Sequence, residues 1–118
     1  MKNIFLLLVF CLVALNYSYS QDTISSSQAK DFVGEFKYVK GFVAEISTAS
    51  KSGITYLNFE NKFPDNIFSA VIFKDYKDVF DFTVLNKCKN IVIYGKIEMY
   101  KEKPQIVLKE ASQIVWCE

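Results

Sequence analysis

The amino-acid sequence predicts a small all-β domain with one short helix between its third and fourth strands and another short helix at its start. Segments rich in Val, Ile, Phe and Tyr recur along the chain, and turn-forming residues separate them. After the first helix the predicted element order is β-β-β-α-β-β. That order in a chain of 118 residues matches a five-stranded Greek-key barrel, the OB-fold. An SH3-like barrel would lack the middle helix, and a ferredoxin-like fold would need helices after its first and third strands.

The first 20 residues have the pattern of a secretory signal peptide. Lys2 precedes an apolar run from Ile4 to Leu15, and the small residues Ser18 and Ser20 fit a cleavage site after Ser20. The apolar run is shorter than a comfortable transmembrane helix. We therefore expect an exported protein, periplasmic or secreted, with one OB-fold domain over 21–118 and no membrane span after cleavage. A retained membrane anchor is the alternative interpretation.

A short N-terminal helix is predicted over 25–34, because Ser25 and Gln28 have the spacing of a capping box and Gly34 ends the pattern. The β-forming run at 35–50 is the first predicted strand. Gly41 inside this run indicates a bulge or a sharp bend.

The second predicted strand, 54–60, alternates strictly between two faces. Tyr56 and Asn58 share one face, and Leu57 and Phe59 share the other. Turn-forming residues at 61–66 lead into a third strand, 67–74, that is apolar on both faces. Leu57, Phe59, Phe68 and Ile72 are therefore predicted to fill the core.

The period then changes from strand to helix. Tyr76, Val79 and Phe80 lie at helical spacing behind Asp75, which predicts a short helix over 75–85. The fourth and fifth strands are predicted at 91–100, with Gly95 as a break, and at 105–109. The closing segment, 110–118, is expected to pack back against the domain.

Composition argues against the common types of enzyme. The chain has no His and no Arg, whereas acid–base catalysis most often uses His and phosphoryl binding favours Arg. Without Lys2, 13 of the 14 basic residues remain, and they balance 13 acidic residues. A neutral chain lacks the basic signature of many nucleic-acid-binding proteins. We therefore predict a non-enzymatic protein without a cofactor or a metal ion.

Two cysteines, Cys88 and Cys117, follow the predicted cleavage site. In an exported protein two thiols favour a disulfide. A hairpin of the last two strands that places Tyr100 opposite Gln105 also places Cys88 opposite Cys117. We predict a disulfide between them, and two partly buried free thiols are the alternative.

Three stretches together resemble a known family: TYLNFENKFPDNIFSAVIF, IVIYGKIEMYKEKPQIVLK and the closing SQI. They are similar to small exported bacterial proteins with an OB-fold nucleic-acid-binding-like domain. In that family a YLNF strand, a YPN-like turn, an FTAVI-like strand and a GKI-Y-GKPQI segment recur. The resemblance covers 31–115, and Glu60 and Glu102 stand where the family pattern commonly has Gly. It implies the OB-fold and a general capacity for binding.

An OB-fold binds oligonucleotides or oligosaccharides on the face of its second and third strands, between flanking loops. Single strands are held by aromatic stacking beside positive charge. The candidate ligand-binding residues are therefore the aromatic and polar side chains of that face and the lysines near it: Tyr56, Asn58, Phe73, Lys51, Lys62, Lys96, Tyr100, Lys101 and Lys103. Because acidic residues lie between these lysines, an ordinary solvated surface is the alternative interpretation.

Three functions fit these observations. The family resemblance favours an exported domain that binds single-stranded nucleic acid. Zero net charge and the two acidic replacements favour a structural or protein-interaction module, or a domain that binds an oligosaccharide on its aromatic side chains.

Overall fold

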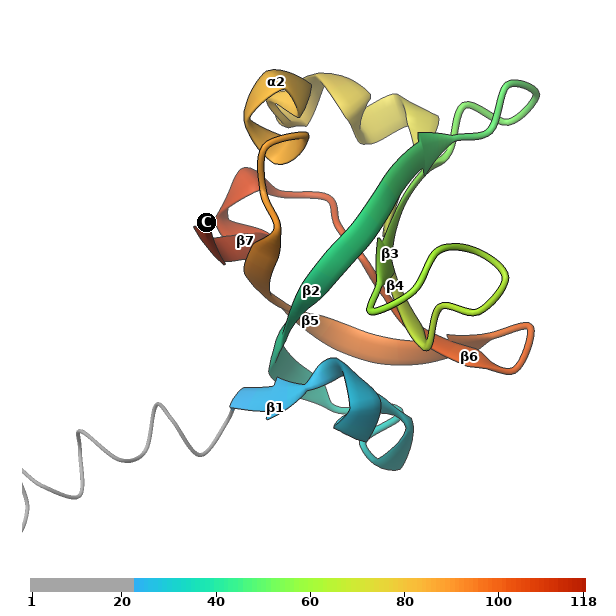
Figure 1. The fold of residues 1–118 in the computed structure, drawn as a ribbon, viewed down its shortest axis with the longest axis vertical. Helices are drawn as coiled ribbons and strands as arrows, with labels where there is room; N and C mark the ends of the chain where they lie inside the picture. Colours follow the sequence, from blue (N-terminus) through green and yellow to red (C-terminus); the bar gives the residue numbers. More distant parts are fainter. Residues whose placement is uncertain (1–22) are drawn as a thin grey trace, which may run out of the picture.

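Figure 1 shows the computed structural model, which describes residues 23–118. The predicted signal peptide at 1–20 lies outside the described residues. The strands are β1 (Thr23–Ser25), β2 (Phe36–Thr48), β3 (Thr55–Phe59), β4 (Phe68–Ile72), β5 (Asn90–Tyr100), β6 (Lys103–Val107) and β7 (Ile114–Cys117). The helical segments are three 3₁₀ helices and one α-helix: η1 (Ser26–Asp31), η2 (Lys74–Val79), η3 (Ala111–Gln113) and α2 (Phe82–Leu85).

The strands of residues 23–118 form one sheet in the order β1-β2-β3-β4-β6-β5-β7, and β2 also pairs with β5. The pairing therefore returns to β2 and curls the sheet into a barrel-like ring (Figure 1). β4 and β6 are parallel, whereas the β2–β3, β3–β4, β5–β6 and β2–β5 pairs are antiparallel. The prediction of an all-β domain is confirmed. The sheet has two strands beyond the predicted five, because β1 and β7 add to its ends.

The two longest strands, β2 and β5, change neighbours halfway along. The first half of β2 pairs with the first half of β5, and its second half pairs with β3. Two glycines allow the close approaches at the bends. A Cβ atom on Gly41 would lie 2.6 Å from the Phe59 ring, and one on Gly95 would lie 2.5 Å from Ile106. The predicted irregularity in β2 follows Gly41, as a register shift between Val43 and Glu45.

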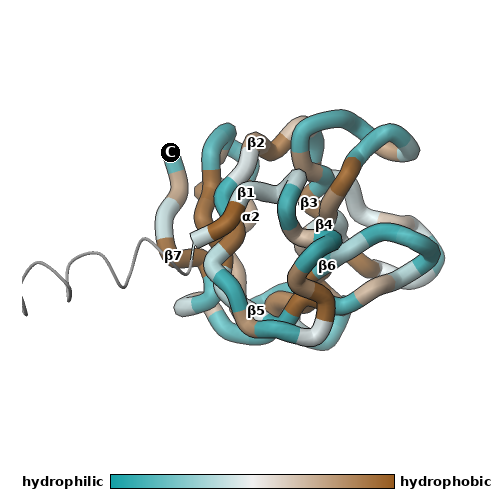
Figure 2. Tube along the Cα trace, turned by 90° about the horizontal axis from the view of Figure 1, so that it is seen from below, coloured by the Kyte–Doolittle hydropathy of each residue, from teal (hydrophilic) through white to brown (hydrophobic). Residues whose placement is uncertain are grey.

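The inward faces of β3 and β4 form the centre of the core. Leu57, Phe59, Phe68 and Ile72 are completely buried, as predicted. The rings of Phe59 and Phe68 meet edge to face at a centroid separation of 5.0 Å, a favourable arrangement for aromatic pairs. In Figure 2, brown apolar stretches alternate with teal hydrophilic stretches around the ring.

Both predicted helices differ from the observed helical segments. Residues Ser26–Asp31 form a 3₁₀ helix, in which Gln28 Oε1 accepts the Ser25 backbone N–H at 2.9 Å. The segment predicted as one helix over 75–85 is divided into η2 and α2. The cap is Asp81, whose carboxylate accepts the N–H groups of the first turn of α2 at 3.0 and 3.4 Å. A capping carboxylate in the middle of the segment favours a new helix start there.

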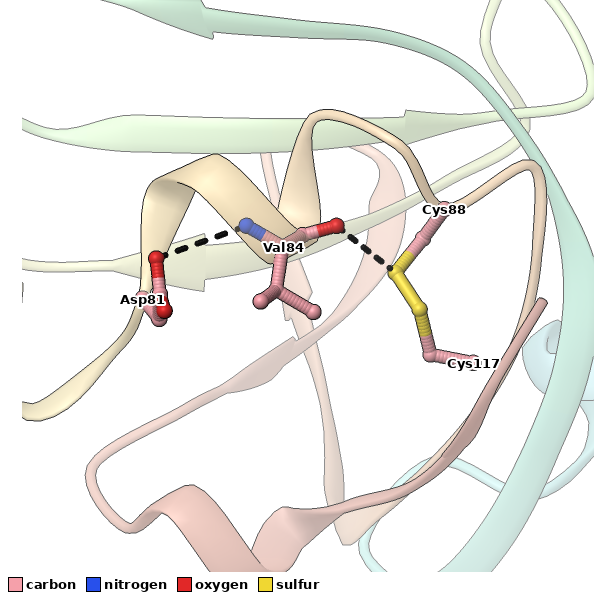
Figure 3. The surroundings of a disulfide bond; sticks show 4 residues. All are labelled: Asp81, Val84, Cys88 and Cys117. Atoms are coloured by element: carbon pink, nitrogen blue, oxygen red, sulfur yellow. Dashed lines mark hydrogen bonds between the residues drawn. A yellow bond between two sulfur atoms is a disulfide. The ribbon is translucent and has the colours of Figure 1, made fainter.

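A disulfide joins Cys88 and Cys117, as predicted, with their Cα atoms 5.5 Å apart (Figure 3). The hairpin register that suggested it is wrong by two residues, because Tyr100 pairs with Lys103. Cys117 reaches Cys88 through β7, where it lies opposite Ile91 of β5. The bond therefore anchors the last strand of the sheet to the loop before β5.

Candidate ligand-binding cleft

A cleft of about 580 Å³ lies over the outward face of β3 and β4. It is bounded by the end of β2, by the loop 60–67 and by the turn between β5 and β6. The lining residues are Glu45, Ser47, Thr48, Ala49, Tyr56, Asn58, Phe63, Asn66, Ser69, Tyr100, Lys101, Lys103, Pro104 and Gln105. This is the face on which the sequence predicts a binding site.

The bottom of the cleft is a chain of hydrogen bonds that we call the polar floor, made by Lys103, Asn66, Ser69, Asn58 and Glu45. Lys103 Nζ donates to Asn66 Oδ1 at 3.1 Å, and Asn66 Nδ2 donates to Ser69 Oγ at 2.8 Å. Ser69 Oγ donates to Asn58 Oδ1 at 3.0 Å, and Asn58 Nδ2 donates to Glu45 Oε1 at 2.9 Å. All donors point the same way, from the ammonium to the carboxylate, so each bond polarises the next.

The loop 60–67 is attached to both ends of the polar floor. The Phe63 backbone N–H donates to Glu45 Oε1 at 2.8 Å, and Lys103 Nζ also donates to the Pro64 carbonyl. The peptide bond between Phe63 and Pro64 is cis. The loop that forms one wall of the cleft is therefore held in place by hydrogen bonds from β2 and β6.

The environment of Glu45 stabilises its charged form. The hydrogen bond from the Phe63 backbone N–H, then that from Asn58, and the nearby charge of Lys62 lower the pKa of Glu45 below its ordinary value. Desolvation acts in the opposite direction and is outweighed. Glu45 is therefore a carboxylate that accepts hydrogen bonds at neutral pH.

Three aromatic side chains surround the opening of the cleft, and we call them the aromatic rim: Tyr56, Phe63 and Tyr100. Phe63 is 73% exposed and Tyr100 is 52% exposed. The ammonium of Lys103 lies 5.6 Å from the Phe63 ring centroid, and that of Lys101 lies 5.4 Å from the Tyr100 ring centroid. The cleft thus offers exposed aromatic surface with positive charge beside it.

The turn that carries Lys101 has an unusual backbone. Lys101 and Glu102 have φ values of 48° and 69°, so both are in the left-handed region. Two such residues between paired strands are the signature of a tight hairpin turn. Glu60 also has a positive φ, 73°, so both Glu60 and Glu102 occupy backbone positions that favour Gly.

The structure brings together five of the nine predicted ligand-binding residues: Tyr56, Asn58, Tyr100, Lys101 and Lys103 line the cleft. Asn58 is only 3% exposed and is hydrogen-bonded within the polar floor. Asn58 therefore lines the cleft as a fixed part of the polar floor.

The other four predicted residues do not line the cleft. Lys51 lies in the turn between β2 and β3, and Lys62 lies in the loop 60–67. Phe73 follows β4 and is 40% exposed outside the cleft. Lys96 lines a second groove, described below.

Sequence reasoning missed Glu45, Phe63, Asn66, Ser69 and Gln105. Ser69 and Gln105 lie in one cross-strand row with Asn58, since Asn58 pairs with Ser69 and Ser69 pairs with Gln105. Strand alternation could have placed Ser69 on the outward face. Asn66 and Phe63 reach the cleft only through the path of the loop, for which the sequence carries no pattern.

No family model and no curated protein matches the sequence. The structure is similar to that of an asparaginyl-tRNA synthetase from Entamoeba histolytica, with a TM-score of 0.51 and 16% identity. That match covers 75% of this chain and 22% of the synthetase, so the chain spans a small part of that protein. A second similar structure is the OBody AM1L10 bound to hen egg-white lysozyme, with a TM-score of 0.49 and 18% identity over 73% of this chain and 85% of that chain.

The match to the synthetase shows a shared fold.

Within residues 23–118, no helix is long and apolar enough to cross a membrane.

Proposed function

We propose that this chain is an exported, non-enzymatic OB-fold domain that binds single-stranded nucleic acid in the cleft. The ring β2-β3-β4-β6-β5 has the strand number and Greek-key order of an OB-fold once β1 and β7 are set aside. β3 and β4 are then the second and third strands of that fold, whose face is its usual binding surface. The fold shared with part of an asparaginyl-tRNA synthetase supports this proposal.

The aromatic rim is the observation that carries the proposal. Tyr56, Phe63 and Tyr100 surround the cleft, and two of them are more than half exposed. Every base has a flat π-face, so exposed rings bind single strands with little dependence on sequence, each stacked base contributing about 1–3 kcal/mol. Lys101 and Lys103, which lie beside two of these rings, supply positive charge for the phosphates.

The charges of the cleft indicate that stacking dominates the affinity. Lys103 and Glu45 are the two ends of the polar floor, and both are hydrogen-bonded to protein groups. Lys101 is at the rim, beside Tyr100. With about one or two phosphate contacts, we expect a plot of log Kd against the logarithm of the salt concentration to rise with a slope of only about 1.

Export is supported by two observations. The first 20 residues have the signal-peptide pattern, and a disulfide joins Cys88 to Cys117. Disulfides persist mainly in oxidising compartments outside the cytosol.

Polar groups of the cleft favour a second candidate function, the binding of a neutral oligosaccharide. The Ser69 hydroxyl and the Gln105 amide line the cleft beneath aromatic side chains. Such groups hydrogen-bond sugar hydroxyls, and OB-folds bind oligosaccharides on this same face. The zero net charge of the chain after the predicted cleavage does not oppose the binding of such an uncharged ligand.

Fluorescence anisotropy of a labelled oligo-dT of about twelve nucleotides, titrated with the oxidised protein, tests the proposal. We expect Phe63→Ala and Tyr100→Ala each to weaken binding about tenfold, the equivalent of about 1.4 kcal/mol. Phe73→Ala is the matched control, because it removes an exposed ring outside the cleft. No binding at low salt would reject the nucleic-acid proposal, and titration with neutral oligosaccharides would then test the second candidate.

A further inference from the structure

A second groove of about 500 Å³ lies beside the first cleft. Phe36 of β2 and Tyr94 of β5 line it, together with Lys96 and Glu98 of β5 and Lys109 and Gln113 near the C-terminus. It faces outward from the half of the barrel where β2 pairs with β5. No part of the proposed function uses this groove.

The groove has a fixed floor at the bend of β5. Gln113 Nε2 donates to the Tyr94 carbonyl at 3.0 Å and to the Val107 carbonyl at 3.1 Å. It therefore bridges β5 and β6 beyond Gly95, where the two strands separate. Gln113 Oε1 accepts the Lys109 and Glu110 backbone N–H groups at 2.7 and 3.0 Å, which fixes the segment before η3.

Aromatic rings form one side of this groove. The rings of Phe36 and Tyr94 are stacked with their centroids 6.1 Å apart. The Tyr38 ring is tilted against that of Tyr94 at a centroid separation of 4.6 Å. Phe36 ends the row and is 61% exposed. An exposed ring at the end of an aromatic row offers a face on which another planar group can stack.

The second groove and the cleft meet at one cross-strand pair. Glu98 lines the second groove, and Gln105, which pairs with Glu98 across β5 and β6, lines the cleft. Along β5, the alternate residues Tyr94, Lys96, Glu98 and Tyr100 share one face. From Tyr100 at the cleft to Tyr94 at the second groove, the strand is about 20 Å long.

We propose that a single strand of nucleic acid bound in the cleft continues past Tyr100 along β5 and stacks on Phe36 and Tyr94 in the second groove. The inference rests on the proposed function. Its basis is the continuity of the two hollows, together with the exposed rings of the cleft and the exposed Phe36 ring in the second groove. Lys96 and Lys109 are balanced by Glu98 and Glu110 in this groove, so stacking provides the added affinity and the salt dependence barely changes.

Two labelled oligo-dT strands test the inference, one of about four nucleotides, which fits the cleft alone, and one of about twelve. We expect Phe36→Ala to weaken binding of the long strand about tenfold and to leave binding of the short strand unchanged. Comparing variants at fixed length removes the statistical advantage of the longer strand, which has more binding registers. Trp116→Ala is the control, since Trp116 is 42% exposed and lines neither groove. Thermal unfolding checks that each variant is folded.

The outcomes separate the two proposals. If neither strand binds, the proposed function itself is rejected. Binding of both strands with no effect of Phe36→Ala, or with an equal loss for both strands, overturns the extended path and leaves the cleft as the site. A wild-type dimer in sedimentation velocity that Phe36→Ala dissociates would assign the aromatic row to a second copy of the chain, which also overturns the extended path.

Discussion

Glu60 and Glu102 have nearly the same positive φ, and replacing each with Gly should have opposite effects on stability. Their φ values are 73° and 69°, in a region that costs a non-Gly residue about 1–2 kcal/mol. Gly removes this strain and loses about 0.5–1 kcal/mol through its greater freedom in the unfolded chain. Glu102→Gly, at an exposed turn, should therefore raise the free energy of unfolding by up to about 1 kcal/mol.

Glu60 differs because its carboxylate joins three parts of the fold. Its Oε1 accepts the Phe42 backbone N–H at 2.9 Å and the Ser26 hydroxyl at 3.0 Å. Ser26 is only 3% exposed, so its buried hydroxyl would lose its hydrogen-bond partner. A hydrogen bond to a charged group contributes about 1.5–3 kcal/mol. Water can replace the partner of the exposed Phe42 N–H, so the net loss is about one such bond. After the backbone gain is subtracted, Glu60→Gly should lower the free energy of unfolding by about 1–2 kcal/mol.

Urea unfolding followed by circular dichroism measures both values on the oxidised protein. The two variants should differ by about 2 kcal/mol, which corresponds to a separation of about 10 °C in Tm for a domain of this size. Glu60→Gln retains an oxygen acceptor and should fall between Glu60→Gly and the wild type. Equal stabilisation by both Gly substitutions would refute the reasoning, because it would mean that the Glu60 hydrogen bonds contribute nothing.

Three further predictions concern the disulfide, the pH dependence and the bend in β2. Replacing Cys88 and Cys117 with Ser opens a loop of 29 residues and should cost about 3–4 kcal/mol in the chain-entropy model, measured by urea unfolding; unchanged stability would contradict it. The pKa of Glu45 is lowered in the folded state, so its stabilisation is complete above the unfolded pKa and is lost as pH falls through the folded pKa. Glu45→Gln should flatten that acidic decline in a pH series of unfolding curves. Gly41→Ala places a Cβ atom 2.6 Å from the buried Phe59 ring and should lower stability by about 1–3 kcal/mol, whereas a neutral effect in thermal unfolding would show that the ring can move.

Strand alternation accounts for what the sequence predicted well. The period of two in β3 separated Tyr56 from Leu57 and Phe59, and the structure places the first at the cleft and the other two in the core. Alternation depends only on local backbone geometry. The same face assignment placed Asn58 outward, but it could not reveal that Glu45 and Ser69 hydrogen-bond and enclose its side chain.

Strand register and loop path were not predictable in the same way. The turn after Tyr100 consists of two residues, Lys101 and Glu102, and both have a positive φ. Neither residue is Gly or Asn, which usually mark such a turn, so the hairpin register was predicted two residues away from the observed one. Phe63 and Asn66 join the cleft because Glu45 and Lys103 hold their loop, and such long-range contacts leave no periodic signal.

The polar floor also determines which parts of this protein can vary without loss of the fold. Phe63 is held through its backbone N–H, which every residue except Pro retains on substitution. Tyr100, the last residue of β5, lies outside the chain of hydrogen bonds between Lys103 and Glu45. A library that randomises these two rim positions and keeps the five residues of the polar floor should therefore yield mostly folded variants with new ligand preferences. The domain thus separates a hydrogen-bonded foundation from an adaptable surface, which is the property sought in a scaffold for engineered binding proteins.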